Sequence, residues 1–362
     1  MRYEPPPRIE WAPDGARVLV CRQGAIRIQR LDGAIVSELA PRRVRLGTAP
    51  RRGEPGSMVD AGYLDARWLS DGRIVAVDEL GMPVQFTMHG VQYGDPVPSP
   101  NPCHQLYADV AVSGKAYVTI DEWRPVVCST APDHPRLWSY WSQSNRCGLP
   151  SQASIRSAAL AADGRRLALG YQGAEESGWV VIELSPPEQP ERSGTWREEV
   201  IDRGAIALED GPEWRPLAFA FDRAGRRLAI LLPERQVSGI GVIRLGAPGA
   251  EPREPREMCE PREMRETREM RETRAMLGGA TSVALDERGV RAAYAYPAGA
   301  SEARLRVDYL APATKGPRVV ESHDTVWLEP DIGELCALAF EPGGHRIACL
   351  GEDGRVAVVP VP

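Results

Sequence analysis

Hydrophobic and polar residues alternate on both sides of a glycine at seven places along the chain. The first copy, residues 10–20, reads EWAPDGARVLV, and the last, residues 339–349, reads AFEPGGHRIAC. In every copy the residues four and six positions before the glycine are apolar, and so is the residue three positions after it. A period of two on both sides of a tight turn predicts strand, turn, strand. The turn glycines are Gly15, Gly72, Gly114, Gly164, Gly225, Gly289 and Gly344.

The second strand of each copy is apolar on both faces. The residue four positions after the glycine is Leu19, Ala76, Val118, Ala168, Ala229, Ala293 or Ala348. An antiparallel sheet with one wet face alternates apolar and polar residues, so these strands are expected to be sandwiched between two neighbouring sheets. Blades stacked around a ring supply that environment. The pattern predicts an all-β fold, a seven-bladed β-propeller of four-stranded antiparallel blades, as a single domain over residues 1–362.

Four segments depart from the repeat. Residues 41–57 are rich in Pro, Gly and Arg, and we interpret them as an exposed loop between blades one and two. In blade three, an aromatic run replaces the outer part. Blade seven has room for only three strands before Pro362, so a fourth strand has to come from residues before Ile9, where three prolines weaken that interpretation.

The fourth departure is a low-complexity insertion at about 247–278, between blades five and six. Residues 251–274 follow a three-residue Glu-x-Arg repeat, in which Cys259 stands at one Arg position. Prolines exclude a helix from its first half, and no apolar stripe would anchor its second half. We expect a mobile excursion that arose by repeat expansion.

The charge balance excludes some classes of partner. The formal net charge is -6, from 44 basic and 50 acidic residues, so no basic field for a nucleic-acid backbone is expected. No stretch approaches the length of an apolar membrane span, and the N-terminus has no secretory core, so we expect no membrane insertion and a cytoplasmic location. The odd number of cysteines, seven, fits free thiols, and strand patterns place Cys21, Cys336 and Cys349 as small buried groups.

Signatures of metal binding and catalysis are weak. Cys103, His104, Cys128, His134 and Cys147 are near one another in the sequence, but no pair has the close spacing usual in structural zinc sites. The chain has neither a G-x-S-x-G nor an H-E-x-x-H motif. Asp14, Asp71 and Asp163 precede turn glycines and are interpreted as turn residues. We predict no catalytic residue, no metal and no cofactor.

The aromatic run in blade three is the candidate protein-binding surface. Its residues are Arg136, Leu137, Trp138, Tyr140 and Trp141. Trp, Tyr and Arg dominate interface hot spots, and a Trp pair in an inserted loop exposes a large apolar area. The alternative is that Trp138 and Trp141 cap the outer edge of blade three.

The hairpins resemble a known family of repeats. WAPDG at residues 11–15 and FEPGG at residues 340–344 are similar to the W/F-S-P-D-G-x-x-Φ-A repeats of WD-repeat and TolB-like β-propellers. The Gly-His and Trp-Asp dipeptides of WD repeats are missing at their expected places, so the TolB-like form is the closer match. The resemblance implies a rigid platform that binds other proteins through its loops.

Two functions remain open at this point. The first is a non-catalytic protein-interaction scaffold, a subunit of a bacterial multi-protein system whose partners are other proteins. The alternative is an enzyme or small-ligand binder that uses the central channel, as lactonase-like or glycosidase-like propellers do. That alternative predicts Asp, Glu or His side chains that converge at one mouth of the channel.

Overall fold

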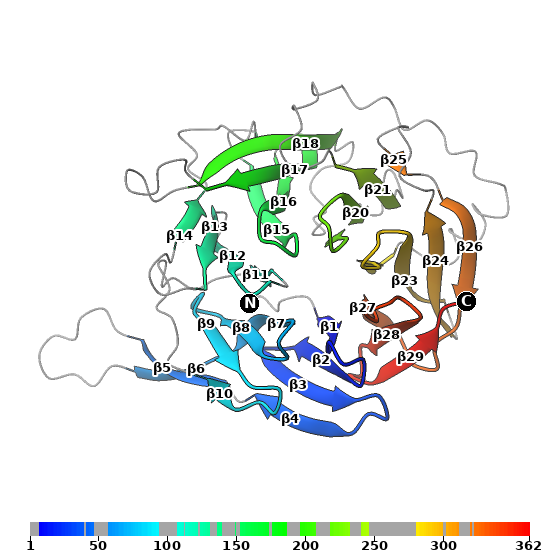
Figure 1. Cartoon of the computed structure of the whole chain (residues 1–362), viewed down its shortest axis with the longest axis horizontal. Coiled ribbons are helices and arrows are strands. Elements are labelled where there is room, and N and C mark those ends of the chain that lie inside the picture. The colour runs from blue at the N-terminus through cyan, green and yellow to red at the C-terminus, as the bar shows by residue number, and fades with distance from the viewer. Residues whose placement is uncertain are drawn as a thin grey trace, which may run out of the picture.

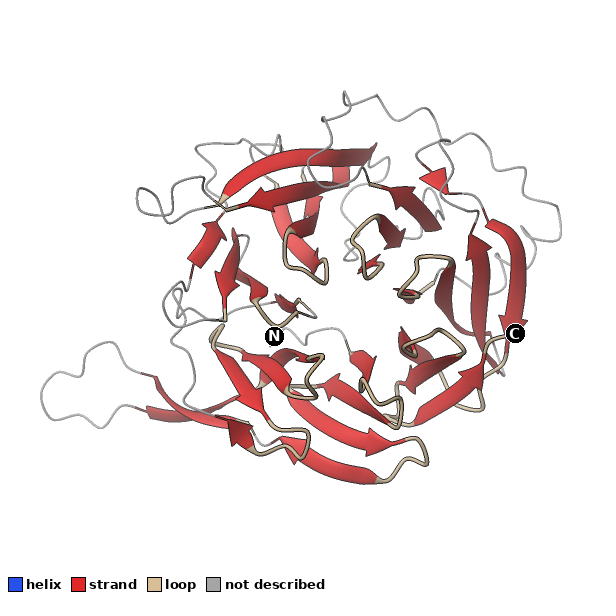
Figure 2. Ribbon diagram, in the orientation of Figure 1, coloured by secondary structure: helices blue, strands red, loops and turns tan. Residues whose placement is uncertain are grey.

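The structure is a computed structural model in which strands are arranged as blades around a central axis (Figure 1, Figure 2). It describes residues 7–39, 41–46, 57–93, 107–111, 113–121, 124–130, 136–139, 149, 153–173, 176–186, 196–207, 218–231, 240–245, 280–299, 302–310, 319–320 and 322–362. Every regular element in these ranges is a β-strand. There are seven blades, and their paired strands are antiparallel, so the predicted fold class is confirmed.

The first four blades follow the chain from the innermost strand outward. Blade one contains β1 (Arg8–Trp11), β2 (Arg17–Arg22), β3 (Ala25–Arg30) and β4 (Ile35–Leu39). Blade two contains β7 (Tyr63–Trp68), β8 (Ile74–Asp78), β9 (Pro83–Phe86) and β10 (Gln92–Tyr93). Blade three contains β11 (Tyr107–Val110), β12 (Ala116–Asp121), β13 (Arg124–Ser129) and β14 (Arg136–Ser139). Blade four contains β15 (Ser154–Leu160), β16 (Arg166–Gln172), β17 (Glu176–Ser185) and β18 (Arg197–Ala207).

Blade five takes its outer strand from the connection within blade six. Its inner strands are β19 (Ala218–Phe221), β20 (Arg227–Leu231) and β21 (Ile240–Arg244). The fourth is β25 (Val319–Val320), which pairs with β21 at Val242 and Ile243. Blade six contains β22 (Ser282–Leu285), β23 (Arg291–Gly299), β24 (Glu302–Leu310) and β26 (Ser322–Leu328). Blades five and six are therefore linked by a strand that hydrophobic periodicity did not reveal.

Blade seven has three strands in the described part of the chain: β27 (Leu335–Phe340), β28 (Arg346–Gly351) and β29 (Val356–Pro360). The prediction that residues before Ile9 complete this blade falls largely on residues 1–6, which lie outside the described residues. The Glu-x-Arg insertion lies outside them as well.

The interpretation of residues 41–57 as a loop was wrong in part. β5 (Arg42–Leu46) and β6 (Ser57–Ala61) form a two-stranded antiparallel hairpin between blades one and two. Figure 1 shows the hairpin projecting outward from the ring. The Pro and Gly signals in the sequence masked the short strand pattern RRVRL, which has an alternating period but little apolar content.

The glycine hairpins form as the pattern predicts. All seven turn glycines have a positive φ, between 63° and 81°, a region that glycine enters without the steric cost a Cβ imposes. The residues four positions after them are all buried, with exposed fractions of 0–1 %. The expectation of a second strand sandwiched between sheets is therefore confirmed.

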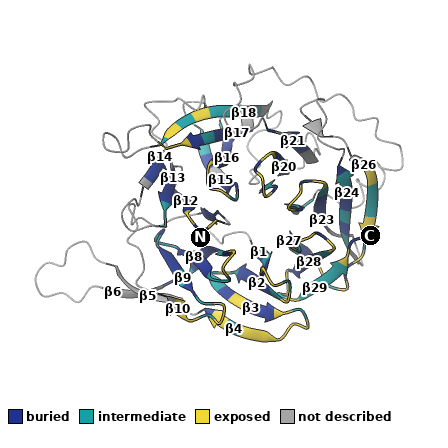
Figure 3. Cartoon of the chain, in the orientation of Figure 1, coloured by how far each residue is buried: buried dark blue, intermediate teal, exposed yellow. Residues whose placement is uncertain are grey.

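The core is divided among the contacts between neighbouring blades. Seven apolar clusters occur, and each joins residues of two adjacent blades, including blade seven with blade one. Figure 3 shows the buried residues concentrated on the inner strands, with exposed residues on outer strands such as β4. In the described part of the chain, no helix is long and apolar enough to cross a membrane.

Candidate functional site

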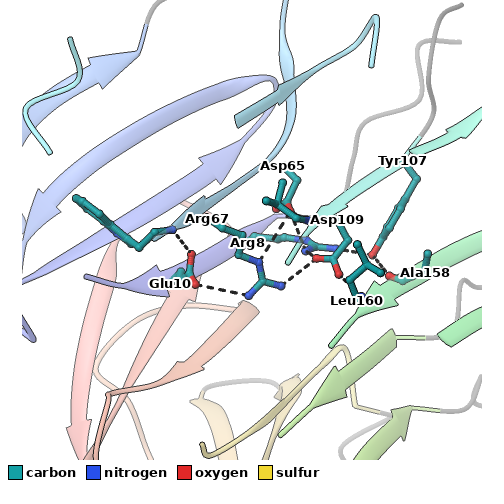
Figure 4. A network of polar contacts seen from close by, with 10 residues as sticks. Arg8, Glu10, Asp65, Arg67, Tyr107, Asp109, Ala158 and Leu160 are labelled. Atoms are coloured by element: carbon teal, nitrogen blue, oxygen red, sulfur yellow. Dashed lines mark hydrogen bonds and ion pairs between the residues drawn. The ribbon is translucent and has the colours of Figure 1, made fainter. Parts of the chain in front are cut away.

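Charged residues gather on the innermost strands of blades one to three. They stand five and seven residues before each turn glycine: Arg8 and Glu10 on β1, Asp65 and Arg67 on β7, and Tyr107 and Asp109 on β11. Figure 4 shows these side chains converging into one network near the axis of the ring. Their convergence meets part of the requirement for a functional channel, because three carboxylates lie together.

Each carboxylate of the network binds the backbone of the next blade. The backbone N–H of Trp68 donates to Glu10 Oε2 at 2.9 Å, and that of Val110 donates to Asp65 Oδ2 at 3.0 Å. The N–H of Leu160 donates to Asp109 Oδ2 at 2.5 Å. The donor is in each case the residue four positions before the turn glycine. The same clamp therefore joins blades one to two, two to three, and three to four.

Two arginines neutralise these carboxylates. Arg8 pairs with Asp109 and, at 3.3 Å, with Asp65 Oδ2, and it also donates to the hydroxyl of Tyr107. Arg67 Nη2 lies 2.9 Å from Asp109 Oδ1, and its Nη1 lies 3.6 Å from Glu10 Oε1. Because Arg8 comes from blade one and Arg67 from blade two, Asp109 of blade three is held by both of its preceding neighbours (Figure 4).

The rest of the inner ring is built from small residues at the equivalent positions. On blades four to seven these are Ser157, Ala159, Ala218, Ala220, Ser282, Ala284, Ala337 and Ala339. The centre of the ring is therefore asymmetric, with a charged side on blades one to three and a small, mostly apolar side on blades four to seven.

Burial and ion pairing shift the pKa values of the carboxyl groups in opposite directions. Burial raises the pKa of Asp65, and the nearby arginines only partly offset it. Burial also acts on Asp109, but Arg8 and Arg67 outweigh it and hold the pKa of Asp109 below its ordinary value. The carboxylates in turn outweigh the burial of Arg8 and keep its pKa well above the ordinary range. Asp109 is therefore the permanently charged centre of the network.

Glu10 makes the stability of the ring depend on pH near neutrality. Burial raises the pKa of Glu10 from 4.5 to about 7, against the opposing effects of Arg67 and the Trp68 N–H. The folded chain binds this proton more tightly than the unfolded chain does. The stabilisation of the fold by protonated Glu10 is therefore complete below pH 4.5 and is lost as the pH rises through about 7. Over this interval we expect the free energy of unfolding of wild type to fall by about 2–3 kcal/mol relative to that of Glu10→Gln.

Urea unfolding of wild type and Glu10→Gln at a series of pH values checks this prediction. Glutamine keeps the acceptor oxygen for Trp68 but cannot ionise, so the difference between the two curves isolates the carboxyl group. Parallel curves from pH 4 to pH 8 would rule out a raised pKa at Glu10.

A second set of contacts, made by arginines, joins three of the four remaining pairs of neighbouring blades. Arginine stands two residues after the turn glycine in blades one, four, five, six and seven. Arg166 donates to the carbonyl of Gly225, Arg227 to that of Gly289, and Arg346 to that of Gly15. Each carbonyl belongs to the turn glycine of the next blade, so these bonds join blades four to five, five to six, and seven to one.

The contact between blades seven and one closes the ring. The indole N–H of Trp11 donates to the carbonyl of Ala339 at 2.9 Å. The guanidinium of Arg346 lies 4.9 Å from the ring centroid of Trp11 and donates to Gly15 O at 3.1 Å. An apolar cluster of β1, β2, β27 and β28 residues packs beneath these contacts. Among the described residues, no strand is shared between blades seven and one. These side-chain contacts therefore close the ring.

Sequence reasoning missed the charged network, although a signal was present. The charges alternate with the apolar positions that define the hairpins, on the same short strands. Asp or Glu stands five or seven residues before the turn glycine in each of the first three copies and is absent from both positions in the last four. That break in the repeat could have pointed to the inner strands.

The aromatic run is only partly described. Leu137 and Trp138 are buried, at 7 % and 2 % exposure, in the cluster that joins blades three and four. The indole N–H of Trp138 donates to Glu198 on β18. Arg136 begins β14, and Tyr140 and Trp141 lie outside the described residues. That this run binds a partner protein stays a prediction. Because Leu137 and Trp138 are buried, it now concerns Arg136, Tyr140 and Trp141.

The cysteines and histidines form no metal cluster in the part of the chain that the structure describes. Of the five candidate ligands only Cys128 is described, and it is buried in β13. Cys21 and Cys349 are buried free thiols, and burial raises the pKa of each to about 12. The prediction of buried thiols at these two positions is confirmed, whereas Cys336 is only partly buried.

Comparisons with known proteins support the fold. No family model and no curated protein matches the sequence. The β-propeller domain of Myceliophteria thermophila Cps50 (Swd1) is 14 % identical with a TM-score of 0.57, over 99 % of this chain and 97 % of that one. A chain of a mitotic checkpoint complex is 10 % identical with a TM-score of 0.56, over 100 % and 88 %. Kuenenia stuttgartiensis hydrazine synthase is 10 % identical with a TM-score of 0.55, over 98 % and 95 %.

These similarities define the class by its fold, a β-propeller. At such low identity they establish the shape of the chain and leave its chemistry open. The closer match to the TolB-like form of the repeat stays a prediction.

Proposed function

We propose that the chain is a rigid, non-catalytic platform that binds other proteins as a subunit of a multi-protein assembly, and that this assembly is bacterial and cytoplasmic. The proposal is supported by the way in which the charged residues of the innermost strands bind the next blade. Glu10, Asp65 and Asp109 each accept a backbone N–H of the next blade, so they serve to lock the blades together.

Two of the three carboxyl groups, those of Asp65 and Asp109, are poorly placed for acid–base chemistry. A general acid or base has to reach a substrate proton at hydrogen-bond distance. Asp65 and Asp109 have exposed fractions of 0 %, and their described partners come from the protein itself. A stiff ring with variable outer segments is instead typical of propellers that present surfaces to other proteins. The free thiols Cys21 and Cys349 support a reducing compartment.

Cross-linking mass spectrometry in native extract tests the platform function. We expect an affinity-tagged chain to give reproducible cross-links from its outer strands and insertions to one or a few proteins. Recovery of the chain alone at its own mass of 39.6 kDa, without cross-links to other proteins, would contradict the proposal.

The docking surface in blade three is tested by a Tyr140→Ala, Trp141→Ala double variant. Trp138 is left intact because it is buried and donates to Glu198, so its loss would disturb the contact between blades three and four. Loss of a partner from the double variant, with an unchanged unfolding midpoint, supports docking at this run. Unchanged partner binding would remove the run as the docking surface.

A second candidate is a small-ligand site in the central channel. The observation that favours it is the partial exposure of the side chains of Arg8, Glu10 and Arg67, at 20 %, 19 % and 28 %, opposite a wall of small residues. This function predicts that some small organic anion raises the unfolding temperature of wild type in a saturable way and has no such effect on Arg67→Gln. A panel of such anions that leaves the unfolding temperature unchanged would argue against it.

A further inference from the structure

Among the described residues, the outer edge of blade seven is unpaired. Six blades have four strands, whereas in the described residues no strand pairs with the outer side of β29. The five residues of β29 are partly or fully exposed. In contrast, β9 and β13, the third strands of blades two and three, are mostly buried. The place that a fourth strand occupies in the other blades thus adjoins an accessible strand edge.

The hydrogen-bond register shows which groups this edge offers. The N–H of Val361 donates to the carbonyl of His345, and the N–H of Gly351 donates to that of Arg355. In an antiparallel ladder alternate residues bond to the same neighbour, so Ala357 and Val359 bond inward to β28. Val356 and Val358 therefore direct their N–H and C=O groups outward. Pro360 also stands at an outward position, where it offers only a carbonyl, as is usual for proline on an edge strand.

The outer strands of the two neighbouring blades, β4 and β26, flank this edge. The wall on blade one is mixed, because Arg27 of β3 and Glu38 of β4 form an exposed ion pair at 3.1 Å on the face opposite Leu39. On β4, Leu39 faces blade two and is 1 % exposed. Ile35 pairs with Gln29 beyond a bulge, which directs it toward blade seven, and it is 54 % exposed. From blade six, Leu328 packs partly against the cluster shared with blade seven. The same strand β4 is thus covered on the face that meets a complete blade and uncovered on the face that meets blade seven.

We propose that an extended segment of a partner protein, with apolar residues at the positions that meet Ile35 and Leu328, completes blade seven by adding antiparallel to the outer edge of β29. Val356 and Val358 supply the backbone hydrogen bonds, and Ile35 and Leu328 contact alternate side chains of the added segment. This is the β-augmentation mode of peptide recognition, in which the strand edge gives affinity and the flanking side chains give specificity. The proposal rests on the platform function and names one of its docking surfaces.

A lone segment fits this place better than a second copy of the ring. β29 is a third strand, and the neighbouring blades extend one strand further, to β4 and β26. The edge is therefore recessed by about 4.8 Å, the spacing of neighbouring strands. In a second copy the same edge is recessed equally, so the fourth strands of the flanking blades would collide before two β29 edges could pair. A single extended chain has no such flanks.

The variant Val358→Pro tests the proposal. It removes one outward N–H without removing a bond to β28, and Val358→Thr is the matched control because it keeps the N–H and the β-branched shape. The probe is a peptide selected for wild-type binding from a displayed library of random dodecapeptides. We expect the peptide to bind Val358→Pro at least tenfold more weakly and Val358→Thr with unchanged affinity. In wild type it should slow hydrogen exchange at the outward N–H groups of Val356 and Val358.

A second variant keeps the test decisive if Val358→Pro loses its fold. Ile35→Asp places a charge on the exposed wall of another blade, where it costs little stability, and should also weaken the peptide at least tenfold. Three results would overturn the proposal: equal binding to wild type and Val358→Pro or Ile35→Asp, slow exchange at Val356 and Val358 in the free chain, or a dimer of the chain that Val358→Pro dissociates. If native partners still cross-link to both variants, this docking site is wrong while the platform function stands.

Discussion

Replacement of Asp109 by alanine is expected to lower the free energy of unfolding by about 3–5 kcal/mol, the range for removing one partner of a buried ion pair. Asp109 is 0 % exposed, pairs with Arg8 and Arg67, and accepts the N–H of Leu160. Without it Arg67 loses its main counter-charge, Arg8 keeps only Asp65, and the clamp between blades three and four is lost. Urea unfolding followed by circular dichroism measures the change.

Two further variants separate the causes of this effect. Asp109→Asn keeps an acceptor for Leu160 but removes the charge, so its destabilisation should fall between wild type and Asp109→Ala. Asp71→Ala is the control, because Asp71 also pairs with an arginine, Arg73, but lies exposed in a turn. It should cost less than about 1 kcal/mol. Equal costs for Asp71→Ala and Asp109→Ala would show that the central network does not hold the blades together.

Trp11→Ala is expected to destabilise the chain by about 3–5 kcal/mol, as large core truncations do. Trp11 is 4 % exposed, donates to Ala339 and lies under Arg346, so the change opens the contact between blades seven and one. Because this contact closes the ring, hydrogen exchange should rise in both β1 and β28. Thermal unfolding together with exchange measured by mass spectrometry tests the prediction.

The equivalent tryptophan of blade two supplies the control for the indole hydrogen bond. Trp68 is also buried, but its indole N–H has no hydrogen-bond partner among the described residues. Trp11→Phe should cost about 1–2 kcal/mol because it removes the hydrogen bond to the Ala339 carbonyl, whereas Trp68→Phe should cost less than about 1 kcal/mol. A larger loss from Trp68→Phe than from Trp11→Phe would contradict the assigned role of the Trp11 bond.

The fold was largely predictable from the sequence because its cause is local. A strand exposes alternate residues to opposite faces, so two periodic stretches around a glycine specify a hairpin wherever they occur. The apolar residue four positions after the glycine then indicates a neighbour on each face. Alanine at that position, as in Ala168 and Ala229, distinguishes stacked blades from a half-exposed sheet.

The candidate site was not predictable in the same way. Arg8, Asp65 and Asp109 are separated by more than 40 residues in the sequence, and nothing along the chain states that they meet. Each sits on a four- to six-residue inner strand whose polar positions resemble those of any half-exposed strand. Only the order of the blades around the axis brings blade one against blade two and blade two against blade three.

By itself the sequence determined the seven hairpins, the sandwiched second strands and the place of the interruptions, because these follow from backbone geometry within a few residues. The tertiary structure alone decided which contacts join the blades: the carboxylate clamps, the arginines bound to turn glycines, and the strand β25 that completes blade five. The reason is physical. These contacts depend on how the blades are stacked after the ring closes, and stacking brings together residues that no local period relates.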